Sequence, residues 1–231
     1  MLARVERFEG FADDEAKFFK ALAKNQNREW FTKHKHEFED GWNRPMLLLL
    51  AEARAAIDRA YAHCELGEPR VFRIYRDVRF SKDKSPYKTH LAGHVSIQSQ
   101  SKAQEAPTAI YLHVGHDERL GAAGLYMMDA PALSRFRTAV TDEARGKELQ
   151  KIVARLEKKG FATGARETLK KVPRGFDPEH PRADLLKSKG LIVTFPPMPK
   201  KVLSSRKVLD WLLPHAKDAA PFVEWLVFAT A

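Results

Sequence analysis

The sequence predicts an α+β fold in which an antiparallel sheet meander packs against N-terminal and C-terminal helices. Three observations support this class. Apolar residues recur at helical spacing up to Gly67, they alternate with polar residues between 68 and 128, and helical spacing returns after Asp129. We therefore expect one α+β domain over residues 1–231, helical over 10–66, mainly strands over 68–128, and helical with a basic loop over 129–231.

The N-terminal third reads as three helices. Residues 13–22 carry acidic side chains in the expected first turn, which suits the helix dipole. Asn25 or Asn27 caps a second helix over 28–36, and Pro45 fits the first turn of a third helix over 45–63.

The middle of the chain reads as strands with short connections. In VFRIYRDVRF, apolar and polar side chains alternate with a period of two, which favours a strand over 72–80. Three further segments have the same character, and we expect them to form a meander: residues 90–100, 107–116 and 119–128.

The C-terminal part returns to helices. Asp129 and Pro131 open a helix over about 130–140, and a charged helix over 141–159 follows the Thr141 cap. The remaining segments are a proline-rich loop over 172–182, a short strand over 191–195, and two helices over about 204–213 and 218–229.

The composition excludes several classes of protein. With 44% hydrophobic and 30% charged residues in a chain of 231, a disordered chain is excluded. The longest apolar run is MLLLLA at 46–51, far short of a membrane span, and the first ten residues lack the apolar core of a secretion signal. The lone cysteine, Cys64, cannot form an internal disulfide, so we expect a cytoplasmic protein without a membrane partner.

The net charge of +10 is concentrated in two segments. Residues 68–90 hold seven Lys or Arg against three Asp or Glu, and residues 160–207 hold eleven against four. If the two segments meet in the fold, they form one positive field that attracts an anion. If they do not, they are two separate solvated basic faces.

The stretch RIYRDVRFSKDKSPYKTH, residues 73–90, is the most unusual part of the sequence. Arginine forks, lysine ammonium groups and hydroxyls are the groups that recognise phosphate or carboxylate. We therefore expect an anion-binding set drawn from this stretch and from the second basic segment: Arg73, Arg76, Arg79, Ser81, Lys82, Lys84, Ser85, Tyr87, Lys88 and Arg174.

Arg76 carries a charge on the apolar side of the strand expected over 72–80. Two explanations remain open: an ion pair with Asp14 or Glu29, or an arginine that binds a ligand at the floor of a pocket.

The same stretch resembles the signature of a family of cytoplasmic proteins built on a domain of unknown function. The resemblance continues in NQNREWF at 25–31, YLHVG at 111–115, GAAGLYM at 121–127 and KKVPRGFDPEHP at 170–181, in the same order. It spans about residues 8–228 and implies one compact domain, but no reaction. The polar residues of these blocks suggest one composite site, with these supporting members: Asn27, Arg28, Trp30, Tyr111, Asp177 and His180.

Catalytic and metal chemistry have weaker signals. Asp77 and His113 are the candidates for orienting a ligand or exchanging a proton. His90, His94 and His113 lie on neighbouring strands and could hold a metal together with Asp77 or Asp83, but no compact ligand motif is present and we predict no metal.

Three functions follow from these patterns. The first is a basic pocket for a phosphorylated or other anionic small molecule, either as a binding site or as part of an enzyme. The second is a module that binds RNA or single-stranded nucleic acid on the same surface, with Tyr75 and Tyr87 stacking on bases. The third is an interaction protein in which the stretch forms only an ion network. The cofactor, the reaction and the oligomeric state stay undetermined.

Overall fold

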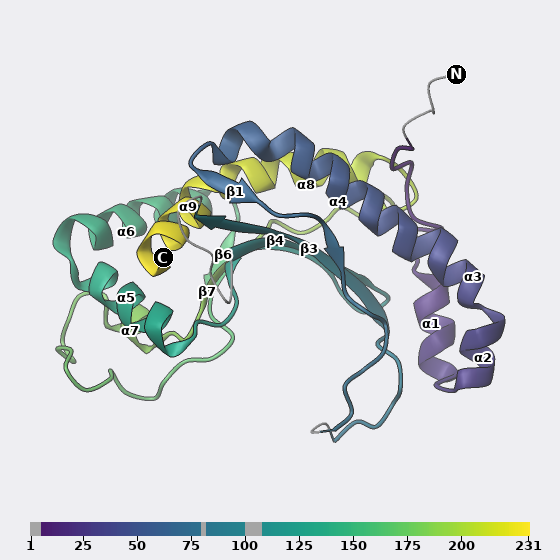
Figure 1. The fold of residues 1–231 in the computed structure, drawn as a ribbon, viewed down its shortest axis with the longest axis horizontal. Helices are drawn as coiled ribbons and strands as arrows, with labels where there is room; N and C mark the ends of the chain where they lie inside the picture. The colour runs from purple at the N-terminus through teal and green to yellow at the C-terminus, as the bar shows by residue number, and fades with distance from the viewer. Residues whose placement is uncertain (1–5, 80–81, 100–107) are drawn as a thin grey trace.

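The chain folds into helices around one antiparallel sheet, as a computed structural model shows for residues 6–79, 82–99 and 108–231 (Figure 1). The α-helices are α1 Lys17–Lys24, α2 Arg28–Lys33, α3 Lys35–Phe38, α4 Arg44–Ile57, α5 Ala130–Thr141, α6 Glu143–Lys158, α7 Ala183–Lys187, α8 Lys207–Asp218 and α9 Ala220–Thr230. A π-helical turn, η1 Glu39–Asn43, precedes α4, and a 3-10 turn, η2 Asp58–Tyr61, follows it. The strands are β1 Cys64–Leu66, β2 Arg70–Val71, β3 His90–Ser99, β4 Thr108–Gly115, β5 Arg119–Leu125, β6 Ala162–Gly164 and β7 Leu191–Thr194. The predicted α+β class is confirmed.

The sheet has the order β1-β3-β4-β5-β7-β6, and β2 also pairs with β3. Neighbouring strands are antiparallel, and β3, β4 and β5 are the expected meander, although β5 ends at Leu125, three residues before the expected end at 128. The expected strand over 191–195 is β7, which joins this meander through β5. Strict alternation on β3 and β4 fixes their register, because a slip by one residue would turn the apolar set away from the core.

The convex face of the sheet is covered by α4, α8 and α9 (Figure 1). The side chains that point to this face, such as Val95, Ile110 and Leu112, are at most 1% exposed. Gly93 lets α4 approach closely, since a Cβ atom there would lie 2.6 Å from Leu50 Cδ1.

The N-terminal helices form largely as the sequence predicts. Asn27 accepts a hydrogen bond from the Trp30 amide at 2.9 Å, so it is the cap of the second helix. Pro45 lies in the first turn of α4. The first helix begins later than expected, at Lys17, and the Asp13 carboxylate accepts a hydrogen bond from the Lys17 amide from outside the helix.

Two predictions about residues 64–80 are wrong. The described residues 72–79 do not form a strand, and only an isolated bridge joins Tyr75 to Tyr87. The alternation of apolar and polar residues therefore does not reflect a strand. Ile74 is buried in a loop, and its carbonyl accepts a hydrogen bond from the Lys88 amide on the other side of that loop at 2.8 Å. The helical part also ends before Gly67, because β1 pairs with the far end of β3.

The C-terminal part follows the prediction with three corrections. Asp129 caps α5 by accepting a hydrogen bond from the Ala132 amide at 2.7 Å, as expected. The next helix is capped by Asp142 rather than Thr141, with the Arg145 amide 2.8 Å away. The short elements β6 and α7 were not predicted, and the two final helices begin two or three residues later than expected. Residues 172–182 form a loop, as predicted.

One hydrophobic core joins side chains from all three parts of the chain, from Phe8 to Ala229. The single-domain organisation stays a prediction of the sequence. None of the helices formed by the described residues has both the length and the hydrophobicity required to cross a membrane.

Candidate functional site

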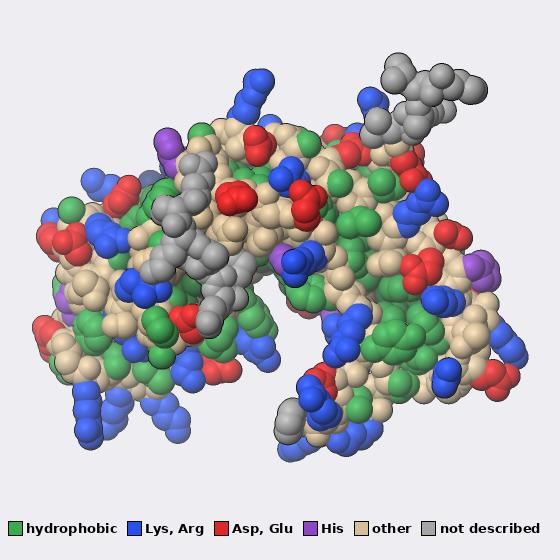
Figure 2. All heavy atoms as spheres, viewed as in Figure 1, with side chains coloured by type: hydrophobic (Ala, Val, Ile, Leu, Met, Phe, Trp, Pro, Cys, Tyr) green, Lys and Arg blue, Asp and Glu red, His purple; other side chains and the backbone are tan. Residues whose placement is uncertain are grey.

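The concave face of the sheet holds a cavity of about 590 Å³. In the space-filling view it opens toward the deep hollow between two lobes, one formed by α1–α3 with the loop after β2, the other by α5–α7 (Figure 2). It is lined by side chains from four strands, from the loop after β2 and from the short connections at the ends of β5: Phe72, Lys88, His90, Ala92, His94, Ala109, Tyr111, His113, Glu118, Leu120, Ala122, Ala123, Gly124, Tyr126, Ile192 and Thr194.

The strand register explains why this face is hollow. One row across the sheet contains His94, Tyr111, Ala122 and Thr194, which are partners on β3, β4, β5 and β7. The next row pairs Ala109 with Gly124 and Gly124 with Ile192. Small side chains in the middle of these rows leave space between larger ones, so the sheet surface itself forms the floor of the cavity.

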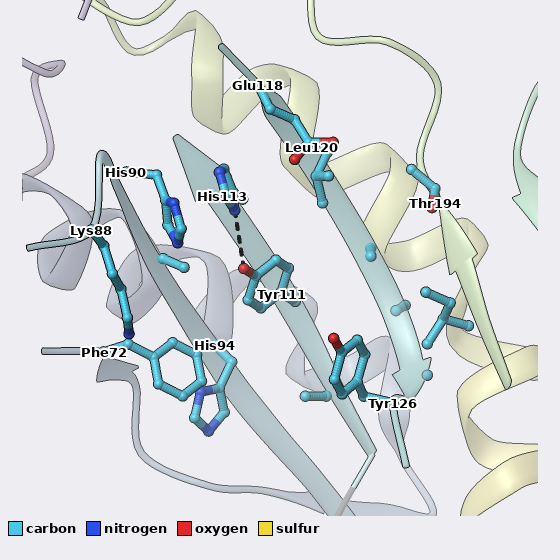
Figure 3. Close-up of a pocket in the computed structure, with 16 residues that line it drawn as sticks. Phe72, Lys88, His90, His94, Tyr111, His113, Glu118, Leu120, Tyr126 and Thr194 are labelled. Atoms are coloured by element: carbon cyan, nitrogen blue, oxygen red, sulfur yellow. Dashed lines mark hydrogen bonds between the residues drawn. The ribbon is translucent and has the colours of Figure 1, made fainter. Parts of the chain in front are cut away.

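A polar cluster occupies one end of the cavity (Figure 3). The imidazole rings of His90 and His113 stack with their centroids 4.1 Å apart and an interplanar angle of 27°. The Tyr111 hydroxyl and His113 Nδ1 share a hydrogen bond of 3.2 Å. Glu118 extends over the same end from the start of β5.

The surroundings of His90, His113 and Tyr111 keep these three side chains uncharged at neutral pH. Burial, followed by the neighbouring His113, Lys88 and Arg76, lowers the pKa of His90 to about 4. Burial also lowers the pKa of His113. Burial, together with Tyr126 and Glu118, raises the pKa of Tyr111 to about 12. These three side chains therefore offer neutral donors and acceptors of hydrogen bonds.

Lys88 brings a positive charge to the same wall. Its Nζ donates a hydrogen bond to the Arg73 carbonyl at 3.1 Å and lies 5.8 Å from the centroid of the Phe72 ring. Burial, with the nearby Arg73 and Arg76, lowers its pKa, and no carboxylate of the described chain forms an ion pair with it. Lys88 is thus a partly desolvated cation without a carboxylate partner.

Two other predicted cations of the 73–90 stretch, unlike Lys88, form ion pairs with carboxylates of the same stretch. Arg76 pairs with Asp83 at 2.9 Å, so its expected partners, Asp14 and Glu29, are wrong. Arg79 pairs with Asp77 at 2.7 Å, and these hydrogen bonds lower the Asp77 pKa. Neither arginine lines the cavity formed by the described residues.

The rest of the stretch forms the loop itself. Lys84 donates to the Val78 carbonyl at 2.8 Å, and the Ser85 amide donates to Asp83 at 2.9 Å. Tyr87 is only 3% exposed and stacks on Phe31 at 4.5 Å, so its ring belongs to the core.

Two more members of the predicted anion-binding set are exposed on the surface, and a third is not among the described residues. Arg73 and Lys82 are exposed. Ser81 lies outside the described residues.

The expected supporting residues divide between the cavity and the scaffold. Tyr111 lines the cavity, whereas Asn27 caps α2, Trp30 stacks on His34 at 4.0 Å, and Arg28 is exposed.

The PRGFDPEHP loop serves a structural purpose. Asp177 accepts from the Glu179 amide at 2.9 Å, and His180 Nδ1 accepts from the Arg182 amide at 3.0 Å. Arg182, which is 5% exposed, donates from Nε to the Val140 carbonyl at 2.7 Å. Arg174 is exposed and is not part of the cavity lining within the described chain.

The sequence reasoning missed Phe72, Tyr126 and Arg166. The Arg166 guanidinium lies 4.9 Å from the centroid of the Tyr126 ring, and Tyr126 is 54% exposed on the cavity wall. Lys88 of the first basic segment therefore lines the cavity, and Arg166 of the second contacts Tyr126 from outside the lining. The sequence did contain a signal for the cavity. Alternate positions on three successive strands carry His, Tyr, Ala and Gly, whereas a sheet face exposed to solvent would carry charged residues.

The histidines do not assemble into a metal site with the expected carboxylates. Among the residues described, no group of three or more His, Cys, Asp or Glu side chains is arranged to hold a metal ion. Asp77 and Asp83 are paired with arginines instead.

Comparison with known proteins gives one family and no individual relative. No curated protein and no solved structure matches the chain. A family model described as "Conserved hypothetical protein (DUF2461)" matches residues 14–225, which include every strand and the whole cavity lining. The chain therefore belongs to the DUF2461 family.

Proposed function

We propose that the chain binds a small organic molecule with an anionic group in the cavity on the concave face of the sheet. The observation that carries this proposal is Lys88, whose ammonium group lies at the cavity wall, partly desolvated and without a carboxylate partner among the residues that the structure describes. A half-buried charge is unfavourable unless it is compensated, and a carboxylate or phosphate of a ligand would compensate it.

The neighbouring groups suit such a ligand. The neutral imidazoles of His90 and His113 and the Tyr111 hydroxyl can donate hydrogen bonds to the ligand's oxygen atoms. Ala92, Ala109 and the other small residues of the floor favour an apolar body. A volume of about 590 Å³ lies within the range of sites that enclose small molecules.

The proposal narrows the anion-binding set that the sequence predicts. Arg76 and Arg79 already have carboxylate partners in their own loop, so they have less to gain from an anion. Exposed cations outside the lining, such as Lys82 and Arg174, would add to the positive field that attracts an anion without touching it.

The test is isothermal calorimetry and thermal unfolding with a panel of carboxylates, phosphates and nucleotides. Lys88→Met removes the charge at the cavity. Lys82→Met removes an exposed charge from the same loop and is the matched control. We expect a small anion to bind and stabilise the wild type and Lys82→Met, with roughly tenfold weaker binding to Lys88→Met.

Other outcomes separate the alternatives. Equal loss of affinity in both variants would refute a role for Lys88 at the site. Stabilisation by RNA or single-stranded DNA alone, falling steeply between two salt concentrations, would favour the nucleic-acid function instead.

A further inference from the structure

The lining of the cavity has an exposed aromatic ring with a cation beside it on each of two opposite sides, and of the two cations Lys88 belongs to the lining whereas Arg166 lies outside it. Lys88 lies beside Phe72 on one side, and Arg166 lies over Tyr126 on the other. Figure 3 shows Phe72 and Lys88 at the β3 side of the cavity and Tyr126 at the β5 side, with Tyr111 between them. We infer that the ligand is an elongated molecule with an acidic group at each end. This inference rests on the function proposed above.

The strand order sets the distance between the two ends. Phe72 directly follows β2, its amide donating to the Ala92 carbonyl of β3 at 2.8 Å, and Tyr126 directly follows β5. Three steps between strands, from β2 through β3 and β4 to β5, separate the rings. At about 4.8 Å per step, the two walls are roughly 14 Å apart across the strands. They are also displaced along the strands, because Phe72 lies in the row of Ala92, His113 and Leu120, whereas Tyr126 comes six residues after Leu120.

The segment that carries Arg166 is fixed to the fold. The Leu169 amide donates to the Lys187 carbonyl at 2.8 Å, and the Lys189 amide donates to the Glu167 carbonyl at 3.0 Å. Glu167 also pairs with Lys189 at 3.1 Å. Arg166 itself has no carboxylate partner among the described residues, so its charge is available to a ligand.

The floor between the two cations consists of small side chains beside the uncharged Tyr111. Ala92, Ala109, Ala122 and Gly124 present methyl groups or backbone to the hollow. A ligand with charges along its whole length would lose hydration there without compensation. The middle of the ligand is therefore aliphatic or aromatic, and both acidic ends are carboxylate or phosphate.

The experiment compares α,ω-dicarboxylates of increasing chain length with monocarboxylates of the same length by calorimetry. We expect the affinity of the dicarboxylates to pass through a maximum with length, and the best of them to bind more tightly than its monocarboxylate. Arg166→Gln should weaken binding of that dicarboxylate about tenfold and leave the monocarboxylate unchanged. Lys170→Gln, at an exposed position of the same loop, should change neither.

Two results would overturn the inference in distinguishable ways. If dicarboxylates bind no better than monocarboxylates, or Arg166→Gln affects both alike, the ligand is not held at two ends, although binding that depends on Lys88 would still uphold the proposed function. If neither series binds to the wild type, the proposed function fails as well. Arg166 is exposed, so the thermal midpoint of Arg166→Gln should match that of the wild type and exclude unfolding as the cause.

Discussion

His90 makes the free energy of unfolding depend on pH between neutrality and pH 4. Its imidazole is half-buried against His113 and is uncharged in the folded protein at pH 7. In the unfolded chain the same imidazole has its ordinary pKa of 6.5, and in the fold the pKa is about 4. Between these values the unfolded chain binds a proton that the folded protein does not bind, so stability falls as the pH falls.

The magnitude follows from the two pKa values. Taking 6.5 for the unfolded chain and about 4 for the fold, protonation linkage between pH 7 and pH 4.5 removes about 2 kcal/mol from the free energy of unfolding. This contribution is fully present above pH 6.5 and is lost as the pH approaches 4.

The assay is urea unfolding of the wild type and His90→Gln at pH 7, 6, 5.5 and 4.5. Glutamine does not titrate, so we expect the wild type to lose about 2 kcal/mol more than the variant between pH 7 and 4.5. Carboxylates that titrate in the same range contribute equally to both proteins and cancel. His36→Gln, at an exposed position on α3, is the control and should follow the wild type.

Parallel pH curves for the wild type and His90→Gln would refute the reasoning. Such a result would mean that the His90 ring is solvated well enough to titrate at its ordinary pKa, and that the polar end of the cavity is not desolvated.

Two further predictions test the scaffold and the cavity floor. Arg182→Met should lower the free energy of unfolding, measured in urea, by about 3 kcal/mol. The substitution leaves the buried Val140 carbonyl at the end of α5 without its hydrogen-bond donor, and a loss under about 1 kcal/mol would contradict this reasoning. Ala122→Leu should change the free energy of unfolding by no more than about 1 kcal/mol, yet abolish binding of the anion in calorimetry, because the longer side chain fills the cavity. An unchanged affinity would mean that the ligand binds elsewhere.

The sequence was sufficient for the elements whose residues alternate or repeat over a long window. In β3 and β4 every second side chain is buried, so periodicity alone identified them. The caps at Asn27 and Asp129 were predictable because a side-chain oxygen beside a helix start has few other partners. The three-residue strands β1 and β6 are too short to show a period, and pairing with β3 and β7 defines them.

The expected strand over 72–80 failed for a different reason. Ile74 and Arg76 do differ in environment from Arg73 and Tyr75, but a strand needs a partner along its length, and alternation does not reveal whether one exists. Arg76 found its carboxylate seven residues ahead, within its own loop, where closing the chain loses little entropy.

The candidate site was predicted in part. Lys88 and His113 were expected from their chemistry and Tyr111 from the family resemblance, and all three line one cavity, while their roles in binding stay predictions. The pairing of Phe72 with Lys88 and of Tyr126 with Arg166 depends on tertiary structure, since residues 126 and 166 come together only through β5, β7 and the segment beyond β6. Counting charges along the sequence also overestimated the number of arginines available to an anion. It cannot show that Asp77 and Asp83 form ion pairs with two of them.

The floor of the cavity lies on β3, β4 and β5, whose backbones are hydrogen-bonded to a strand on either side and packed against helices on the convex face. Such a surface keeps its shape with or without a ligand. Little conformational entropy is then lost on binding, apart from that of the Lys88 and Arg166 side chains. Discrimination between ligands would come from how well their length matches a preorganised template, rather than from closure of the protein around them.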